Sequence, residues 1–138
     1  MTLRIIIADD HPVVRVGTKS VIEARGVGEV VAQASGVDEL YAILATTKCD
    51  VLVTDYSMPG SVKPDGLAMI GTIRRNHPDL HVLMLTVSNN LAILRVVVQE
   101  GVLGLVEKSS SMDELPVAIQ TVAAASRTSA GRSRSAST

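Results

Sequence analysis

Short aliphatic segments recur at similar intervals along the chain and are separated by longer, more polar segments. Five of them are rich in β-branched residues and lie at residues 3–8, 29–34, 51–54, 81–86 and 104–106. The third and fourth are nearly unbroken apolar runs, which are typical of parallel strands covered on both faces of a sheet. The pattern therefore predicts five strands of a buried sheet.

The segments between and after these strands have helical length, and they cover residues 12–25, 37–46, 67–76, 90–100 and 112–125. Pro12 suits the first turn of a helix, where a missing N–H leaves no hydrogen bond unmade. Gly101 stands in the position of a C-terminal cap. Ser111 and Glu114 have the spacing of a capping box, but Pro116 is awkward for a helix that begins at residue 112. The last helix is therefore expected to begin at residue 112 or later.

Strand and helix alternate five times, which predicts an α/β fold. Right-handed crossovers would give a five-stranded, parallel, doubly wound sheet of the flavodoxin-like type, with helices on both faces. A chain of 138 residues suffices for one such domain, and we assign it to residues 1–125. Residues 126–138 are rich in Ser, Thr, Ala, Gly and Arg, so we expect a flexible tail or linker there.

The composition excludes several classes of function. The net charge is −1 and the chain has no Phe or Trp, so it lacks both the basic field and the stacking rings of most nucleic-acid binders. Cys49 is the single cysteine, which rules out an internal disulfide and a cysteine metal cluster. No signal peptide or membrane span is recognisable. We therefore expect a soluble, cytoplasmic protein without membrane contact.

Polar residues follow the predicted strands at the points where they end. In a doubly wound sheet, ligands bind beyond the carboxyl ends of the strands. Asp9 and Asp10 follow the first strand, and Asp55 follows the third. The remaining candidates follow the fourth and fifth strands: Thr86, Ser88, Glu107 and Lys108. Three carboxylates, a hydroxyl and a lysine are thus expected to converge in one pocket.

This set of side chains indicates phosphoryl chemistry. Three adjacent carboxylates repel one another unless a cation joins them, and an all-oxygen site favours a hard ion such as Mg²⁺. Lys108 supplies a second positive charge for an incoming phosphoryl group. Asp55 would end the central strand, and a carboxylate there can attack phosphorus to give an aspartyl phosphate. We therefore predict that Asp55 is the nucleophile.

Residues 3–125 resemble the receiver domains of two-component response regulators. The matching residues are Asp9 and Asp10, residues 55–59 (DYSMP), Thr86 and Lys108. The resemblance implies that Asp10, Asp55 and the backbone carbonyl of Ser57 bind Mg²⁺, with Asp9 acting through water. It also implies that Thr86 and Lys108 contact the phosphoryl oxygens. The donor would be a phosphohistidine on a sensor histidine kinase or phosphotransfer protein, and the chain itself would not be an enzyme, although receivers can dephosphorylate themselves.

A narrower likeness is carried by residues 8–12 (ADDHP), by the long loop at residues 59–66 and by residues 113–116 (DELP). These are similar to the class whose receivers precede a LuxR/FixJ-type helix-turn-helix, and within it to regulators of the Rcs phosphorelay. The likeness implies transcription regulation, a homodimer on phosphorylation, and DNA contact only through a C-terminal domain that is not in this chain. Leu105 departs from the family, because most receivers carry Tyr or Phe there as an activation switch.

Three other interpretations remain open at this point. A phosphatase with an aspartyl nucleophile needs a second Asp two positions after the first, where this chain has Ser57. A flavin or dinucleotide carrier should offer Gly or a hydroxyl to phosphates after the first strand, where Asp9 and Asp10 would repel them. A receiver-shaped interaction module that is never phosphorylated would be expected to lack an essential Asp or the lysine, and this chain has both.

Overall fold

The computed structural model describes residues 2–87, 91–108 and 113–124. The elements follow one another in this order: β1 (Arg4–Ala8), α1 (Pro12–Ala24), β2 (Glu29–Ala34), α2 (Val37–Thr46), β3 (Val51–Asp55), α3 (Gly66–Asn76), β4 (His81–Thr86), α4 (Leu91–Gln99) and β5 (Gly104–Glu107). A further helix, called the C-terminal helix below, covers residues 114–124. The predicted alternation is confirmed, and the observed boundaries agree with the predicted ones to within two residues.

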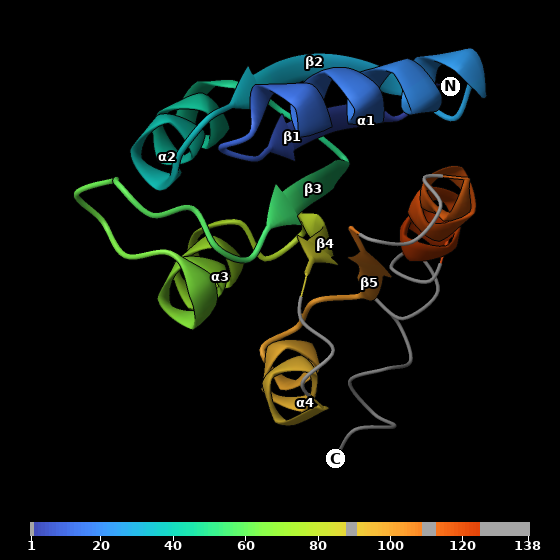
Figure 1. Ribbon diagram of the computed structural model, residues 1–138. Helices are drawn as coiled ribbons and strands as arrows, with labels where there is room; N and C mark the ends of the chain where they lie inside the picture. Colours follow the sequence, from blue (N-terminus) through green and yellow to red (C-terminus); the bar gives the residue numbers. More distant parts are fainter. Residues whose placement is uncertain (1, 88–90, 109–112, 125–138) are drawn as a thin grey trace.

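All five strands form one parallel sheet in the order β2-β1-β3-β4-β5 (Figure 1). The order reverses direction at β1 and β3, which are hydrogen-bonded neighbours. Ligand sites in such sheets lie at this reversal, beyond the carboxyl ends of the strands. The predicted flavodoxin-like topology is confirmed, and β3 is the central strand.

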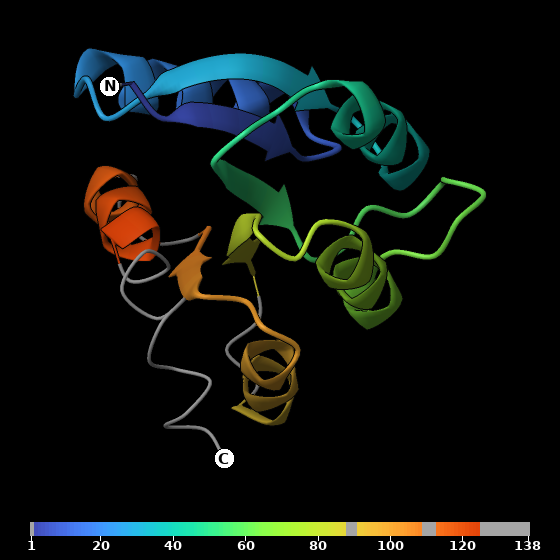
Figure 2. The ribbon, with the colours of Figure 1, turned by 180° about the vertical axis from the view of Figure 1, so that it is seen from behind.

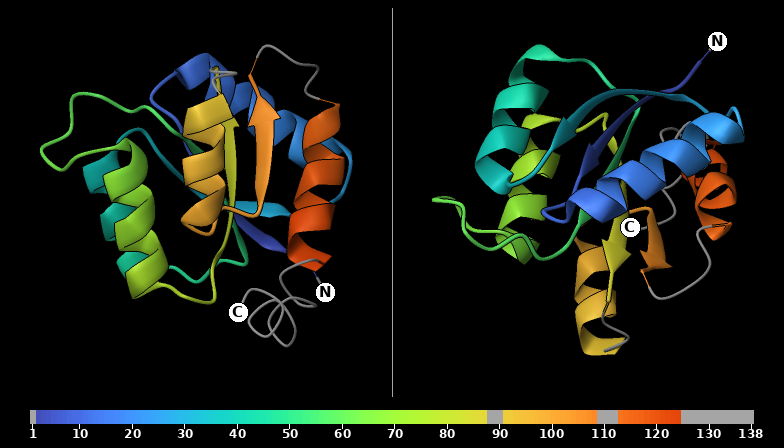
Figure 3. Two further views of the ribbon diagram at one scale, coloured as in Figure 1. Left: turned by 90° about the horizontal axis from the view of Figure 1, so that it is seen from below. Right: turned by 45° about the horizontal axis from the view of Figure 1, so that its top comes forward.

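Successive side chains of each strand point to opposite faces of the sheet, as the pleat requires. Ile5 and Ile7 of β1 belong to a buried cluster completed by α1 and the C-terminal helix. Ile6 and Ala8 belong to the other cluster, which α2, α3 and α4 complete. Figures 1–3 show these two helical layers with the sheet between them. Both faces of the sheet are thus buried against aliphatic side chains, as the unbroken apolar runs predicted.

Two sequence signals at helix ends are confirmed. Gly101 follows α4 with φ at +107°, and its N–H donates to the carbonyl of Val98. A left-handed conformation of this kind favours glycine. The C-terminal helix begins at residue 114 and not at 112. Pro116 therefore lies in its first turn, where the backbone N–H groups make no hydrogen bond within the helix and a proline is tolerated. The predicted cap Ser111 lies outside the described residues, as does the tail at residues 126–138.

No helix in the described part of the chain is long and apolar enough to span a membrane.

Candidate functional site

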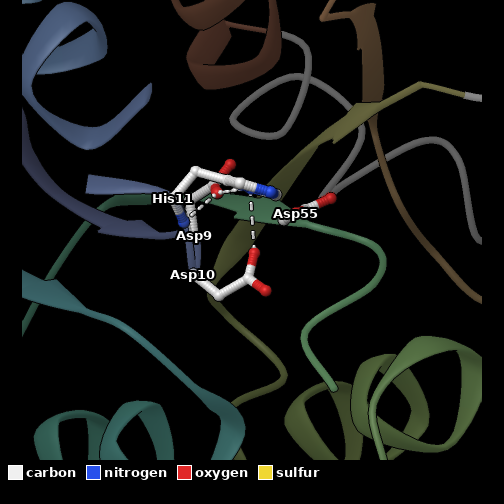
Figure 4. Close-up of side chains that lie close together, drawn as sticks. All are labelled: Asp9, Asp10, His11 and Asp55. Atoms are coloured by element: carbon white, nitrogen blue, oxygen red, sulfur yellow. Dashed lines mark hydrogen bonds and ion pairs between the residues drawn. The ribbon is translucent and has the colours of Figure 1, made fainter. Parts of the chain in front are cut away.

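The carboxyl ends of β1 and β3 bring three carboxylates together. Asp9 and Asp10 follow β1 directly, and Asp55 is the last residue of β3. One ligand atom from each of them, and one from the ring of His11, all lie within 4.8 Å of one another (Figure 4). The predicted convergence of the three carboxylates is therefore confirmed.

Asp9 is completely buried and is held from several sides. Its Oδ1 atom accepts the backbone N–H of His11 at 2.9 Å, and its Oδ2 atom lies 2.8 Å from the ammonium of Lys108. The guanidinium of Arg15 donates to its backbone carbonyl at 2.6 Å. A buried carboxylate needs such partners, and these contacts fix the end of β1 in one position.

Asp55 is 5% exposed, and its Oδ2 atom accepts a hydrogen bond from Lys108 Nζ at 2.8 Å. Burial raises the pKa of the Asp55 carboxyl, Lys108 opposes that rise, and the neighbouring charge of Asp9 adds to it. The nucleophile predicted from the sequence thus lies in a buried, electrostatically unfavourable place. A cation that joined it would remove much of that cost.

Lys108 follows β5, and its backbone N–H donates to the carbonyl of Thr86 on β4 at 2.8 Å. Burial by itself lowers the pKa of the Lys108 ammonium, but its hydrogen bonds to Asp55 and Asp9 outweigh burial and raise the pKa above its usual value. Lys108 therefore stays charged and bridges two carboxylates. One ammonium is shared by two acids, so negative charge remains in excess.

The backbone of Ser57 contacts the carboxylate of Asp55, and Thr86 ends the neighbouring strand β4. The backbone N–H of Ser57 donates to Asp55 Oδ1 at 3.3 Å, which places the start of the loop after β3 beside the site. Thr86 ends β4, the strand paired with β3, and is 3% exposed. Of the other strand-end candidates, Ser88 lies outside the described residues, and Glu107 is not a member of the carboxylate cluster found among the described residues.

The donor set suits a hard divalent cation. It offers carboxylate oxygens at a sheet edge, the type of ligand that Mg²⁺ prefers. In the described part of the chain, Asp10 Oδ1 is buried without a hydrogen bond, and its close neighbour is the ring nitrogen of His11. A buried carboxylate oxygen of this kind is ready to bind a cation. The residues present therefore fit the predicted metal.

Two residues near the site were not predicted to act there. The Nδ1 atom of His11 lies 3.0 Å from both Asp9 Oδ1 and Asp10 Oδ1 (Figure 4). Arg15 is one helical turn further along α1. Adjacency to Asp10 is a signal that could have singled out His11. No comparable signal marks Arg15, because its contact with the Asp9 carbonyl depends on how α1 leaves the sheet.

Comparison with known proteins agrees with this geometry. Residues 5–120 match the model of the response regulator receiver domain. The chain belongs to the receiver family. This receiver is 38% identical over 117 residues to the transcriptional regulatory protein RcsB of Salmonella typhi, and 35% identical over 120 residues to the oxygen regulatory protein NreC of Staphylococcus epidermidis. The matches cover 85% and 87% of this chain but 54% of each relative, so the receiver spans about half the length of these relatives.

Solved structures give the same result. The isolated receiver domain of RcsB from Salmonella enterica serovar Typhimurium, determined with the phosphomimetic BeF3−, superimposes with a TM-score of 0.82 at 36% identity and covers 87% of both chains. A complex of RcsB with DNA gives a TM-score of 0.83 at 35% identity, over 88% of this chain and 60% of that one. The predicted likeness to regulators of the Rcs phosphorelay is confirmed. The family is one of receivers, so the comparison supports neither a phosphatase nor a nucleotide carrier.

Leu105 occupies the position where most receivers carry an aromatic residue. It lies on β5, is partly buried, and packs against the cluster that includes α4. Together with α4 it lines a groove of about 370 Å³. A branched aliphatic side chain at this position provides no ring that could swing between outward and inward positions.

Proposed function

We propose that this receiver accepts a phosphoryl group on Asp55 from a phosphohistidine of a sensor histidine kinase or phosphotransfer protein. The observation that carries the proposal is the place of Asp55: it ends the central strand, it is buried, and it lies 2.8 Å from Lys108 and next to Asp9 and Asp10. In the transfer, a carboxylate oxygen forms a bond to phosphorus while the bond from phosphorus to the imidazole nitrogen breaks. The imidazole leaves with the electron pair of that bond and takes up a proton.

Positioning and electrostatics supply most of the rate in such transfers. Mg²⁺ would be held by Asp10, Asp55 and the Ser57 carbonyl, with Asp9 acting through water, and it would neutralise charge on the transferring group. Lys108 would release Asp9 and follow the phosphoryl oxygens, and the Thr86 hydroxyl would contact them from β4. Hydrolysis of the aspartyl phosphate by water at the same site would give slow self-dephosphorylation.

The experiment that tests the proposal is modification by acetyl phosphate, followed by intact-mass spectrometry. The wild type should gain one phosphoryl group when Mg²⁺ is present and none when EDTA removes it. Asp55→Asn should gain none, because an amide is a poor nucleophile. Asp79→Asn is the matched control, because it removes an exposed carboxylate just before the amino end of β4, whereas the site lies at the carboxyl ends of the strands, and it should be labelled like the wild type. Equal labelling of Asp55→Asn and the wild type would refute the assignment, whereas an unlabelled wild type would favour a receiver-shaped interaction module that is not phosphorylated.

We further propose that the receiver forms residues 1–125 of a cytoplasmic transcription regulator, with residues 126–138 as a linker. The support is its likeness to RcsB, which is named a transcriptional regulatory protein and has been solved as dimers on DNA. DNA binding would then require a C-terminal domain outside this sequence. Residues 1–138 should accordingly give no sequence-specific gel shift that survives added salt, since purely electrostatic binding weakens steeply with ionic strength.

A further inference from the structure

The turn between β2 and α2 contacts both of the segments that carry the phosphorylation site. On one side, the backbone N–H of Asp9 donates to the carbonyl of Ala34, the last residue of β2, at 3.0 Å. On the other side, the backbone N–H of Val37, the first residue of α2, donates to the hydroxyl of Ser61 at 2.9 Å. The segment at residues 56–65, called the β3–α3 loop here, runs beside α2 in Figures 1 and 2. The turn therefore bridges Asp9 and the loop that begins beside Asp55.

Asp38 in the first turn of α2 makes the firmest of these contacts. Its Oδ2 atom accepts the backbone N–H of Val62 at 2.8 Å, and its Oδ1 atom accepts that of Lys63 at 3.1 Å. These two hydrogen bonds lower the pKa of the Asp38 carboxyl, so the group is ionised at neutral pH. A carboxylate that receives two successive backbone N–H groups fixes the orientation of the loop as well as its distance from α2.

The base of the β3–α3 loop is fixed as well. The Asp65 carboxylate accepts the backbone N–H of Met58 at 2.7 Å, and the N–H of Gly66 donates to the carbonyl of Tyr56 at 3.0 Å. The Met58 side chain is 1% exposed. Ser57 lies between these anchors, four residues before Ser61. With its base closed and its middle attached to α2, the loop has little freedom to move the Ser57 backbone.

The turn itself is hydrogen-bonded and closely packed. Glu39 accepts both the backbone N–H and the hydroxyl of Ser35, at 2.6 and 2.9 Å. A Cβ atom added at Gly36 would lie 2.8 Å from the Ser61 hydroxyl oxygen, which is too close for an unshifted contact. Gly36 also provides no side chain to cap α2, so Ser61 performs that role from the loop.

From these contacts we propose that Asp38 and Ser61 are positioning residues of the phosphorylation site. They hold the β3–α3 loop on α2, and thereby set the place of the Ser57 carbonyl relative to Asp9, whose backbone N–H donates to Ala34 at the start of the same turn. Neither residue touches the carboxylates of the site. The inference rests on the proposed function, because it assumes that the Ser57 carbonyl and the acidic pair bind one cation.

The test measures Mg²⁺ and BeF3− binding to the full chain by NMR titration, together with the melting temperature of each variant. Asp38→Ala and Ser61→Ala should each weaken Mg²⁺ binding by about 10-fold, a size typical of losing an outer contact of a metal site. Ser61→Thr keeps a hydroxyl and should bind nearly like the wild type. Val62→Ala is the matched control, since the Val62 side chain is 95% exposed and its N–H is retained.

A double-mutant cycle isolates the contact itself. Gly36→Ala should weaken Mg²⁺ binding in the wild type, because its Cβ displaces the Ser61 hydroxyl. In a Ser61→Ala background the oxygen is gone, so Gly36→Ala should cost little more. Additive effects in this cycle would overturn the proposed role of the contact.

The outcomes separate the inference from the function on which it rests. If the wild type binds Mg²⁺ and BeF3− but Asp38→Ala and Ser61→Ala bind them equally well, the positioning role is wrong and the proposed function stands. A lower melting temperature with unchanged affinity would show a merely structural contact and also refutes the inference. If Asp38→Ala does not fold, Asp38→Asn replaces it in the test. Asparagine keeps the shape of the side chain but places an NH₂ donor opposite one of the two backbone N–H groups, so this variant should weaken Mg²⁺ binding in the same way. A wild type that binds neither ligand would refute the proposed function itself.

Discussion

The ammonium of Lys108, which follows β5, lies 2.8 Å from the carboxylate of Asp55 at the end of β3. The two residues are 53 positions apart in the chain, and β4 separates their strands in the sheet. The same ammonium lies 2.8 Å from Asp9. One ammonium thus pairs with two buried carboxylates, which leaves the site with an excess of negative charge. We therefore expect the stability of the protein to depend on pH and on bound Mg²⁺.

Asp55→Asn should stabilise the metal-free protein at neutral pH. The substitution removes a buried charge and leaves Lys108 paired with Asp9 alone. We expect a gain on the order of 1 kcal/mol, or roughly 3 °C in melting temperature. The folded-state pKa of Asp55 is raised, so its favourable contribution is present at low pH and is lost as the pH rises through that pKa.

The advantage of Asp55→Asn should therefore be small in acid and should grow as the pH increases from about 4 towards neutral. Thermal melts in EDTA at several pH values measure this, with Asp79→Asn as the control that should show no such trend. A mutant less stable than the wild type at neutral pH would contradict the prediction.

Mg²⁺ affinity should depend more on Asp10 than on Asp9. The Asp10 side chain is 26% exposed and its Oδ1 atom lies 3.0 Å from the ring of His11, whereas the Asp9 carboxylate is completely buried and already contacts the ammonium of Lys108 and the N–H of His11. Asp10→Ala should weaken Mg²⁺ binding at least about 10-fold, and Asp9→Ala should weaken it less.

Calorimetric titration measures this order. Bound Mg²⁺ should also stabilise the wild type by about 1.4 kcal/mol at ten times its Kd, and at the same Mg²⁺ concentration this gain should fall to about 0.4 kcal/mol or less in Asp10→Ala. Equal Mg²⁺ affinity of the wild type and Asp10→Ala would remove Asp10 from the metal site.

Phosphorylation should be read out as self-association, because Leu105 leaves no ring to swing inward behind Thr86. Binding of BeF3− should draw Lys108 and Thr86 towards Asp55 and favour one of two surface states through differential affinity. Sedimentation velocity should show a dimer with BeF3− and mainly monomer without it. A monomer in both states at high concentration would contradict this prediction.

Two charged variants distinguish the candidate surfaces for this dimer. Val117 of the C-terminal helix is 61% exposed, on the same face of the sheet as α1, and Leu91 of α4 is 70% exposed beside the groove that Leu105 lines. Val117→Glu should abolish the dimer if the surface is that of α1 and the C-terminal helix, which we favour. Loss of the dimer in Leu91→Glu alone would assign it to α4 and β5.

Cys49 should be nearly inert in the folded protein. Burial, together with the nearby charge of Asp50, raises the pKa of its thiol to about 12, and the thiolate is the reactive form. At pH 8 its reaction with a disulfide reagent should be at least about 100-fold slower than that of the unfolded chain. Absorbance of the released thiol measures both rates, and rapid labelling of the native protein would show that the raised pKa is wrong.

Much of this protein follows from the sequence alone. The alternation of aliphatic runs and helical segments predicted the five-stranded parallel sheet, because a strand buried on both faces is predominantly apolar. The sheet in turn brings the carboxyl ends of its strands to one edge, so the positions of Asp9, Asp10, Asp55 and Lys108 at or just after strand ends were enough to predict that they meet. The strand pattern was sufficient to predict this site, because the position of each of these residues is set by the strand that it ends or follows.

Only the tertiary structure decided the contacts between side chains and the attachment of the loop to α2. The sharing of Lys108 between Asp9 and Asp55, and the ring of His11 between two carboxylates, depend on side-chain directions that spacing in the chain does not specify. The attachment of the β3–α3 loop to α2 through Asp38 and Ser61 joins segments 24 and 25 residues apart by hydrogen bonds to backbone N–H groups. Every residue type except proline offers that N–H, so the sequence carries no sign of which one is used, and only the packing of α2 against the loop selects it.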